Sequence, residues 1–222
     1  MISFSGTPTI VFALALVVLA ACAPPAEPLP KMAMHTAATK GDLKMMEAAL
    51  AAGQDVNGRG RSDATPLIYA VWADQPEMVR ALLAKGANLQ RVDSSDRSAL
   101  HYAAQNGFIG VATILIDAGA DVNMENAYGF SPLIAASMEG RVEVIQLLLA
   151  HGANVNQADL AAKTPLHFAL KQKQDAAARA LVEGGANLNA VDREGRRPLT
   201  EGKARGVDAA TVEHLISRGA KE

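Results

Sequence analysis

The side chains best suited to chemistry in this 222-residue chain are five histidines and one cysteine. An imidazole can bind a metal ion or move a proton near neutral pH, and a thiolate can act as a nucleophile or a ligand. His35, His101 and His167 follow one another at intervals of 66 residues. The sequence holds no glycine-rich phosphate loop, no HExxH motif and no GxSxG motif. The regular histidine spacing therefore indicates a repeated structural unit, and we expect no enzymatic activity and no catalytic residues.

The single cysteine, Cys22, lies at the end of an uncharged apolar segment that spans residues 10–21. Twelve residues would rise about 18 Å as a helix, which is too short to cross a hydrocarbon core of about 30 Å. Such a segment near an N-terminus is typical of a secretory signal peptide. Four prolines follow within residues 23–31 and predict an extended spacer of about 30 Å.

The residues Leu19-Ala20-Ala21-Cys22 resemble the lipobox of bacterial lipoproteins. The resemblance implies cleavage before Cys22 and a diacylglycerol on its thiol, which makes residues 1–21 a signal peptide and residues 22–31 a lipidated linker. The alternative is an ordinary signal peptide that is cut near Ala21 or Ala23. The first nine residues depart from the lipoprotein pattern because they contain no Lys or Arg. In a Gram-negative cell, Ala23 in place of Asp favours the periplasmic face of the outer membrane.

Four segments recur at a spacing of 33 residues, and a second apolar block follows each of them. The segments are TPLIYAVWAD (65–74), SALHYAAQNG (98–107), SPLIAASMEG (131–140) and TPLHFALKQK (164–173). A Thr-Pro or Ser-Pro pair predicts a helix start, and the glycine near the end of a segment predicts a helix end. In the second block, apolar residues such as Val111, Leu115 and Ile116 share one helix face. Neither short helix can bury its apolar face alone, so we expect the units to stack around one continuous core.

These blocks resemble the ankyrin repeat, whose pattern begins TPLHxAA and ends in GAdvN. The resemblance implies an all-α ankyrin-repeat solenoid over residues 32–222, built from helix-turn-helix repeats with hairpin-like loops. Six repeats are expected, near residues 32–64, 65–97, 98–130, 131–163, 164–196 and 197–222. The first repeat lacks the Thr-Pro start and contains four methionines, so we expect it to act as a cap, as we do the charged last repeat.

The repeat also explains the spaced histidines and aspartates. In the ankyrin family, the histidine of the TPLH block hydrogen-bonds to the starts of its own and the neighbouring repeat, which is the role implied for His35, His101 and His167. Histidines two repeats apart would lie about 20 Å from each other, too far to share a metal ion. Asp93, Asp159 and Asp192 recur at one turn position, and Asn126 replaces the aspartate in one copy. Turn formation explains these residues better than acid–base chemistry does. We therefore expect neither a metal nor a cofactor.

Composition limits the classes of partner. The 21 basic and 23 acidic residues give a net charge of −2, which provides no argument for nucleic acid as a partner. No small-molecule substrate is indicated either, and we expect a monomer that contacts the membrane only through its N-terminal lipid. The remaining partner class is another protein, bound on the concave face that first helices and hairpins form in ankyrin stacks.

Large apolar residues at contact positions of the family identify the candidate surface, because packing does not require them there. Trp72 and Tyr128 are interpreted as contact residues, whereas Phe130 could equally pack on a neighbouring repeat. Tyr69, Tyr102 and Phe168 form a second set for which we favour packing. The full set of candidate partner-binding residues is Trp72, Tyr128, Phe130, Met138, Gln105, Asn106 and Lys171.

The sequence thus predicts a non-catalytic interaction scaffold, anchored by lipid at the bacterial cell envelope. Two sharper hypotheses remain open. The protein could be an immunity factor that neutralises a periplasmic toxin or lipase, or an adaptor that holds an envelope enzyme or complex in place.

Overall fold

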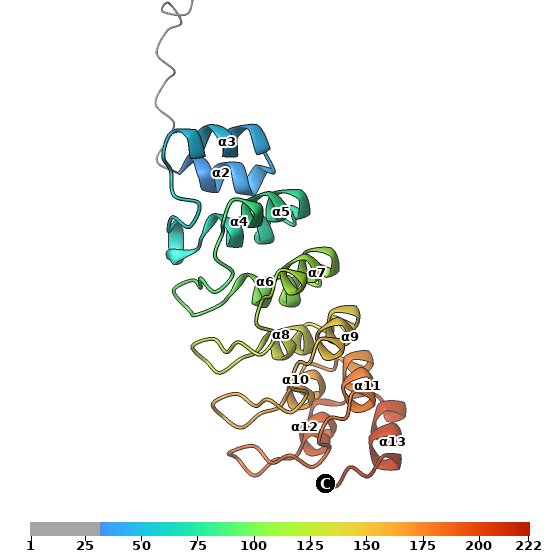
Figure 1. The fold of residues 1–222 in the computed structure, drawn as a ribbon. Helices are drawn as coiled ribbons and strands as arrows, with labels where there is room; N and C mark the ends of the chain where they lie inside the picture. The colour runs from blue at the N-terminus through green and yellow to red at the C-terminus, as the bar shows by residue number, and fades with distance from the viewer. Residues whose placement is uncertain (1–31) are drawn as a thin grey trace, which may run out of the picture. The chain divides into compact units, whose positions relative to one another are not determined.

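The computed structural model describes residues 32–222, which consist of helices and connecting loops without a β-strand. Twelve α-helices form six antiparallel pairs that stack along one direction (Figure 1). The predicted all-α solenoid is confirmed. Cys22 and the predicted signal and linker lie outside the described residues.

In each pair a first helix is followed, after a tight turn, by a second helix. The pairs are α2 (Ala33–Lys40) with α3 (Leu43–Ala51), α4 (Pro66–Trp72) with α5 (Pro76–Ala84), α6 (Ala99–Asn106) with α7 (Ile109–Asp117), α8 (Pro132–Met138) with α9 (Val142–Ala150), α10 (Pro165–Lys171) with α11 (Asp175–Glu183), and α12 (Pro198–Arg205) with α13 (Ala209–Ser217). A short 3-10 turn, Arg61–Asp63, precedes α4.

First helices begin where the sequence predicts them. The Thr65 and Ser131 hydroxyls accept hydrogen bonds from the backbone N–H groups three residues later, at 3.4 Å and 3.3 Å, and a proline follows each cap. Asp74 and Lys173 replace the glycine that follows a first helix, and both adopt a left-handed conformation, with φ of 48° and 57°. The Thr-Pro signal therefore determines both the start and the direction of these helices.

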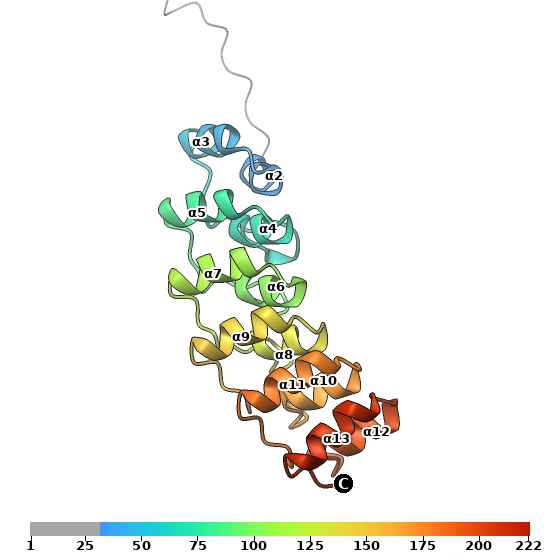
Figure 2. The same ribbon diagram turned by 90° about the vertical axis from the view of Figure 1, so that its right-hand side faces the viewer.

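The first helices form one row and most of the second helices form another (Figure 2). Leucines of the first helices are buried between neighbouring pairs, together with aliphatic residues of the second helices such as Val111 and Leu115. The loops that join one pair to the next form hairpins that project on one side of the first helices (Figure 1). Successive hairpin tips are joined by backbone hydrogen bonds, for example from Leu160 N–H to the Tyr128 carbonyl at 3.3 Å. Each hairpin is thereby held in register with the next.

The N-terminal pair has the features expected of a cap. Met32 occupies the N-cap position of α2 and offers no side-chain hydrogen bond. As a result, the buried Nδ1 atom of His35 has no hydrogen-bond partner among the described residues, although its Nε2 atom lies 3.1 Å from the Gly58 carbonyl. Met34 and Met46 are fully buried and fill the core beneath this pair.

A recurring asparagine joins neighbouring repeats at the ends of the second helices. The Asn123 amide donates to the Gly152 carbonyl at 3.2 Å, and its side-chain oxygen accepts from Asn154 N–H at 2.7 Å. Asn57 and Asn189 make equivalent pairs of bonds to the repeats that follow them. Gln90 stands at the same position of its own repeat. The asparagine therefore links consecutive repeats just beyond the ends of their second helices.

We expect Asn123→Ala to lower the free energy of unfolding by about 1–2 kcal/mol, because two inter-repeat hydrogen bonds are lost. The measurement is chemical denaturation followed by circular dichroism. Gln90→Ala is the matched control and should cost less than about 0.5 kcal/mol. Equal losses in both variants would contradict the linking role of the asparagine.

Candidate functional site

A pocket of about 280 Å³ opens between the third and fourth helix pairs, where α6 and α8 meet the hairpin that joins them. We call it the Tyr128 pocket. It is lined by Ser95, Arg97, His101, Gln105, Asn126, Tyr128, Phe130, Ala135, Met138 and Glu139. All these residues belong to first helices or to hairpins, so the pocket lies on the surface for which the sequence predicts partner binding.

The hairpin that carries the two aromatic residues is shaped by Asn126. Its side-chain oxygen accepts hydrogen bonds from the backbone N–H groups of Tyr128 and Phe130, at 2.9 Å and 3.0 Å. Gly129 has a φ of 75°, and a Cβ atom there would lie 2.9 Å from the backbone nitrogen of Leu160. Only glycine can therefore occupy this turn without displacing the next hairpin. The turn places Tyr128 outward and Phe130 toward the helices.

Tyr128 and Phe130 provide the aromatic wall of the pocket. Tyr128 is 62% exposed, whereas Phe130 is partly buried and packs edge-on against Phe168, with ring centroids 5.1 Å apart. The Tyr128 and Phe130 rings are 6.1 Å apart and inclined by 48°. Phe130 thus packs on a neighbouring repeat and also lines the pocket, and its contact with a partner stays a prediction.

His101 supports the pocket from beneath. Its Nδ1 atom accepts a hydrogen bond from the Ser98 backbone N–H at 3.2 Å, so the ring proton must lie on Nε2, which donates to the Phe130 carbonyl at 2.8 Å. Burial lowers the pKa of His101, an effect that the hydrogen bond to Phe130 only partly offsets. The neutral imidazole holds the hairpin in place, and both of its ring nitrogens are used in these structural hydrogen bonds.

Arg97 lines the pocket but carries a compensated charge. Its guanidinium forms an ion pair with the buried Asp93 carboxylate at 3.2 Å and lies 4.5 Å above the Tyr102 ring. Burial alone would raise the pKa of Asp93, but hydrogen bonds from the Tyr102 hydroxyl and the Arg97 and Ser95 backbones hold that pKa below its ordinary value. Asp93 therefore stays ionised and neutralises Arg97.

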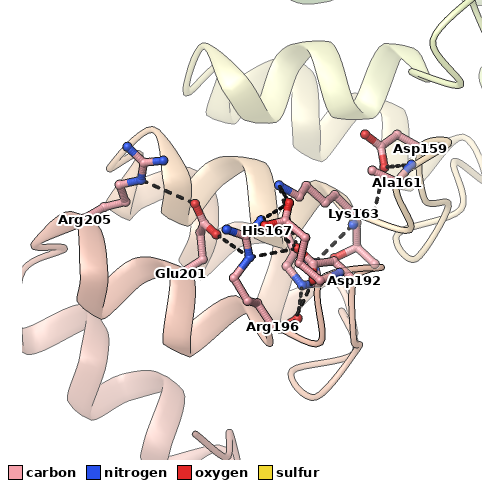
Figure 3. A network of polar contacts seen from close by, with 10 residues as sticks. Asp159, Ala161, Lys163, His167, Asp192, Arg196, Glu201 and Arg205 are labelled. Carbon is pink, nitrogen blue, oxygen red and sulfur yellow. Dashed lines mark hydrogen bonds and ion pairs between the residues drawn. The ribbon is translucent and has the colours of Figure 1, made fainter.

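The same histidine arrangement recurs at His167, within a larger polar network near the C-terminus (Figure 3). Glu201 is buried and lies 3.4 Å from both the Arg196 and the Arg205 guanidinium nitrogens. Asp192 contacts Arg196 at 3.1 Å and Lys163 at 3.7 Å. This network joins the last two repeats. Acidic and basic groups alternate through it, so each of these charged groups has a partner of opposite charge and none is free to act on a substrate.

The structure brings together four of the seven candidate partner-binding residues. Gln105, Tyr128, Phe130 and Met138 line the same pocket. The other three, Trp72, Asn106 and Lys171, do not line it. Whether any of the seven contacts a partner stays a prediction.

The three residues outside the pocket have other surroundings. Trp72 is 37% exposed and packs against Tyr69 and Tyr102, with ring centroids 4.9 Å and 5.2 Å away. Asn106 donates to the Tyr102 carbonyl at 2.9 Å and so caps its own helix. Lys171 is partly buried at the end of α10. Packing on two tyrosines therefore covers part of the Trp72 ring, and a partner could contact only the part that remains exposed.

Several pocket residues are absent from the sequence-based set, namely Ser95, Arg97, His101, Asn126, Ala135 and Glu139. Their positions in the repeat are regular, so the 33-residue period could have placed them on this surface. These residues line one pocket because the turn at Gly129 directs Phe130 toward the helices. No single residue in the sequence predicts this arrangement.

Within residues 32–222, no three His, Cys, Asp or Glu side chains lie close enough together to hold a metal ion. Across the same residues, no helix has the length and apolar character needed to span a bilayer. The aromatic wall and the polar rim of the Tyr128 pocket can bind a side chain or peptide segment, and they contain no nucleophile paired with a free base.

Comparison with known proteins agrees with this arrangement. A family model described as ankyrin repeats in three copies matches residues 3–93 and 89–159, and a model of the single ankyrin repeat matches residues 163–193. No curated protein matches the chain. Among solved structures, the chain is similar to an ankyrin repeat domain from Acinetobacter baumannii AYE, with 27% sequence identity and a TM-score of 0.78. The similarity covers 86% of this chain and 100% of that domain.

The buried histidines predict acid lability. Burial lowers the pKa of His35, His101 and His167 below the ordinary value of 6.5. Below that pH the unfolded chain binds more protons than the folded one, so the free energy of unfolding should fall as the pH drops from 7 to 5, with each histidine contributing at most about 1.4 kcal/mol per pH unit. Asp93 and Asp192, whose pKa values are lowered from 3.8, lose their contribution only at more acidic pH.

The check is denaturant unfolding at several pH values. His167→Gln should reduce the slope between pH 7 and 5, and His151→Gln, at an exposed position, should leave it unchanged. A slope that is the same in all three proteins would contradict the assignment of neutral buried histidines.

Proposed function

The chain belongs to the ankyrin-repeat family, and from that premise we propose that it is a non-catalytic scaffold that binds a partner protein on its concave surface. Ankyrin repeats are protein–protein interaction modules, and their stacked, rigid repeats bind with little rearrangement. The observation that carries the proposal is the Tyr128 pocket. It combines an exposed aromatic residue with apolar and hydrogen-bonding neighbours, as the binding hot spots of interfaces do.

The apolar residues around this pocket are not explained by folding alone. Tyr128 and Leu160 are 62% and 58% exposed on adjacent hairpins. Met138 is partly exposed at the end of α8 and lines the same pocket as Tyr128. Exposed apolar groups that gather at one place mark contact sites more often than isolated ones do. The proposed interface is therefore centred where the third and fourth repeats meet, with Trp72 contributing only if the partner extends toward the N-terminal cap.

We further propose that a lipid on Cys22 anchors the scaffold to the bacterial cell envelope, on the periplasmic face of the outer membrane. The support is the sequence LAAC at residues 19–22 after an apolar segment, followed by Ala23. Two or more acyl chains hold a protein stably at a membrane, because each buried CH₂ contributes about 0.8 kcal/mol. Anchoring would present the concave surface to envelope proteins at high local concentration.

The binding proposal is tested by affinity capture from detergent-solubilised envelopes with the tagged full chain. We expect Tyr128→Ala/Met138→Ala to reduce recovery of the dominant partner at least tenfold, since truncating a hot spot costs about 2 kcal/mol or more. Ile109→Ala is the matched control, because Ile109 is 42% exposed on a second helix. Full recovery by a folded double variant would contradict the proposed site.

The anchoring proposal is tested with Cys22→Ser expressed in the native host. We expect the variant to leave the membrane pellet for the soluble fraction and the wild-type N-terminal peptide to carry the mass of a diacylglycerol or a triacyl group. A variant that pellets as the wild type does would refute lipid anchoring through Cys22.

A further inference from the structure

We propose that the Tyr128 pocket accepts the side chain of a single arginine from the partner protein. This inference rests on the proposed function and specifies what the partner inserts. The pocket volume of about 280 Å³ is just below the range for small-molecule sites, about 300–1,000 Å³. That size suits one long side chain of a docked protein.

The charge balance of the pocket is the first argument. Glu139 is exposed at the end of α8 and makes no ion pair within residues 32–222. The Arg97 charge is neutralised by Asp93. The Nε atom of Arg97 has no hydrogen-bond partner in the described part of the chain, but it is buried and a ligand cannot reach it. His101 is held neutral by its two hydrogen bonds. The pocket therefore carries one uncompensated negative charge, on Glu139.

The aromatic wall is the second argument. Tyr128 and Phe130 are inclined by 48° with centroids 6.1 Å apart, so a flat group that enters the pocket meets at least one ring face. Aromatic faces attract cations, and a guanidinium is the biological cation that stacks best because it is planar and weakly hydrated. Met138 and Ala135 add apolar surface for the aliphatic part of the same side chain.

The remaining polar groups favour arginine over the alternatives. Gln105 and Ser95 also line the pocket, and their side chains contain an amide oxygen and a hydroxyl that can accept hydrogen bonds; with the Glu139 carboxylate they match the several N–H donors of a guanidinium. A lysine would bring a compact, strongly hydrated charge that stacks less well. An uncharged apolar side chain would leave Glu139 partly desolvated and unpaired, which is unfavourable. An acidic side chain would face Glu139 directly.

The test is a titration of the full chain in detergent, labelled with ¹³C at the methionine methyl groups. The probes are Nα-acetyl-arginine amide and Nα-acetyl-citrulline amide, which have the same shape and differ in charge. We expect the arginine probe to shift the Met138 methyl signal in a saturable way and the citrulline probe to bind at least tenfold more weakly. The signal is assigned by its disappearance in Met138→Leu.

Variants at two glutamates make the charge argument decisive. Glu139→Gln should bring the affinities of the two probes within about twofold of each other, equivalent to less than about 0.5 kcal/mol. Glu143→Gln removes the same charge from the exposed surface of α9 and should leave the preference intact. Three results would overturn the proposal. The wild type could bind the arginine and citrulline probes equally, or it could bind Nα-acetyl-lysine amide or Nα-acetyl-glutamate amide more tightly than the arginine probe. The third is the absence of a Met138 shift at the solubility limit of the arginine probe.

Partner capture separates this inference from the proposed function. Loss of the partner in both Tyr128→Ala/Met138→Ala and Glu139→Gln supports the two together. Loss in the first variant with full capture by Glu139→Gln overturns the arginine inference and leaves the proposed function intact. Full capture by both variants overturns the two.

Discussion

The architecture depends on hydrogen bonds that join a side chain of one helix pair to the backbone that leads into the next pair or lies within it. His101 holds the Phe130 carbonyl at 2.8 Å, His167 holds the Arg196 carbonyl at 3.2 Å, and Asn123 joins Gly152 and Asn154. Each helix pair is too small to bury its own apolar surface, so its stability comes from its neighbours. These bonds fix the spacing and direction of the neighbours while the leucines of the first helices fill the space between them. A regular stack with one hairpin-bearing side follows from these contacts.

A rigid stack separates residues needed for folding from residues free to bind. Core positions repeat every 33 residues and are filled with Leu, Val, Ala and Ile, whereas the ends of first helices and the hairpin tips vary from repeat to repeat. In this chain the variation places Tyr128, Phe130 and Met138 around one pocket, next to a carboxylate without a counter-ion in the described residues. The fold thus supplies the position of the site, and a few surface residues supply its chemistry.

The sequence predicted the helices, their caps and the roles of His101 and His167, because each follows from a local pattern repeated at a fixed period. The same prediction was wrong in part for His35, because Met32 offers its Nδ1 atom no hydrogen bond at the start of α2. Thr65-Pro66 and Ser131-Pro132 are examples in which two adjacent residues determine a helix start. The site was predicted less completely. Exposure of Trp72 depends on how it packs against Tyr69 of its own helix and Tyr102 of the next helix pair, and the pocket depends on the turn at Gly129. Such properties arise between repeats, so position within a repeat cannot reveal them.

The measurement that tests the central claim most directly is hydrogen–deuterium exchange of the full chain with and without its captured partner. The account predicts that protection on binding is concentrated in the hairpin of residues 124–131 and in α8, with little change in α9 and α11. Protection confined to the second helices, with the hairpin of Tyr128 exchanging as in the free protein, would contradict it and place the binding surface on the opposite side of the stack.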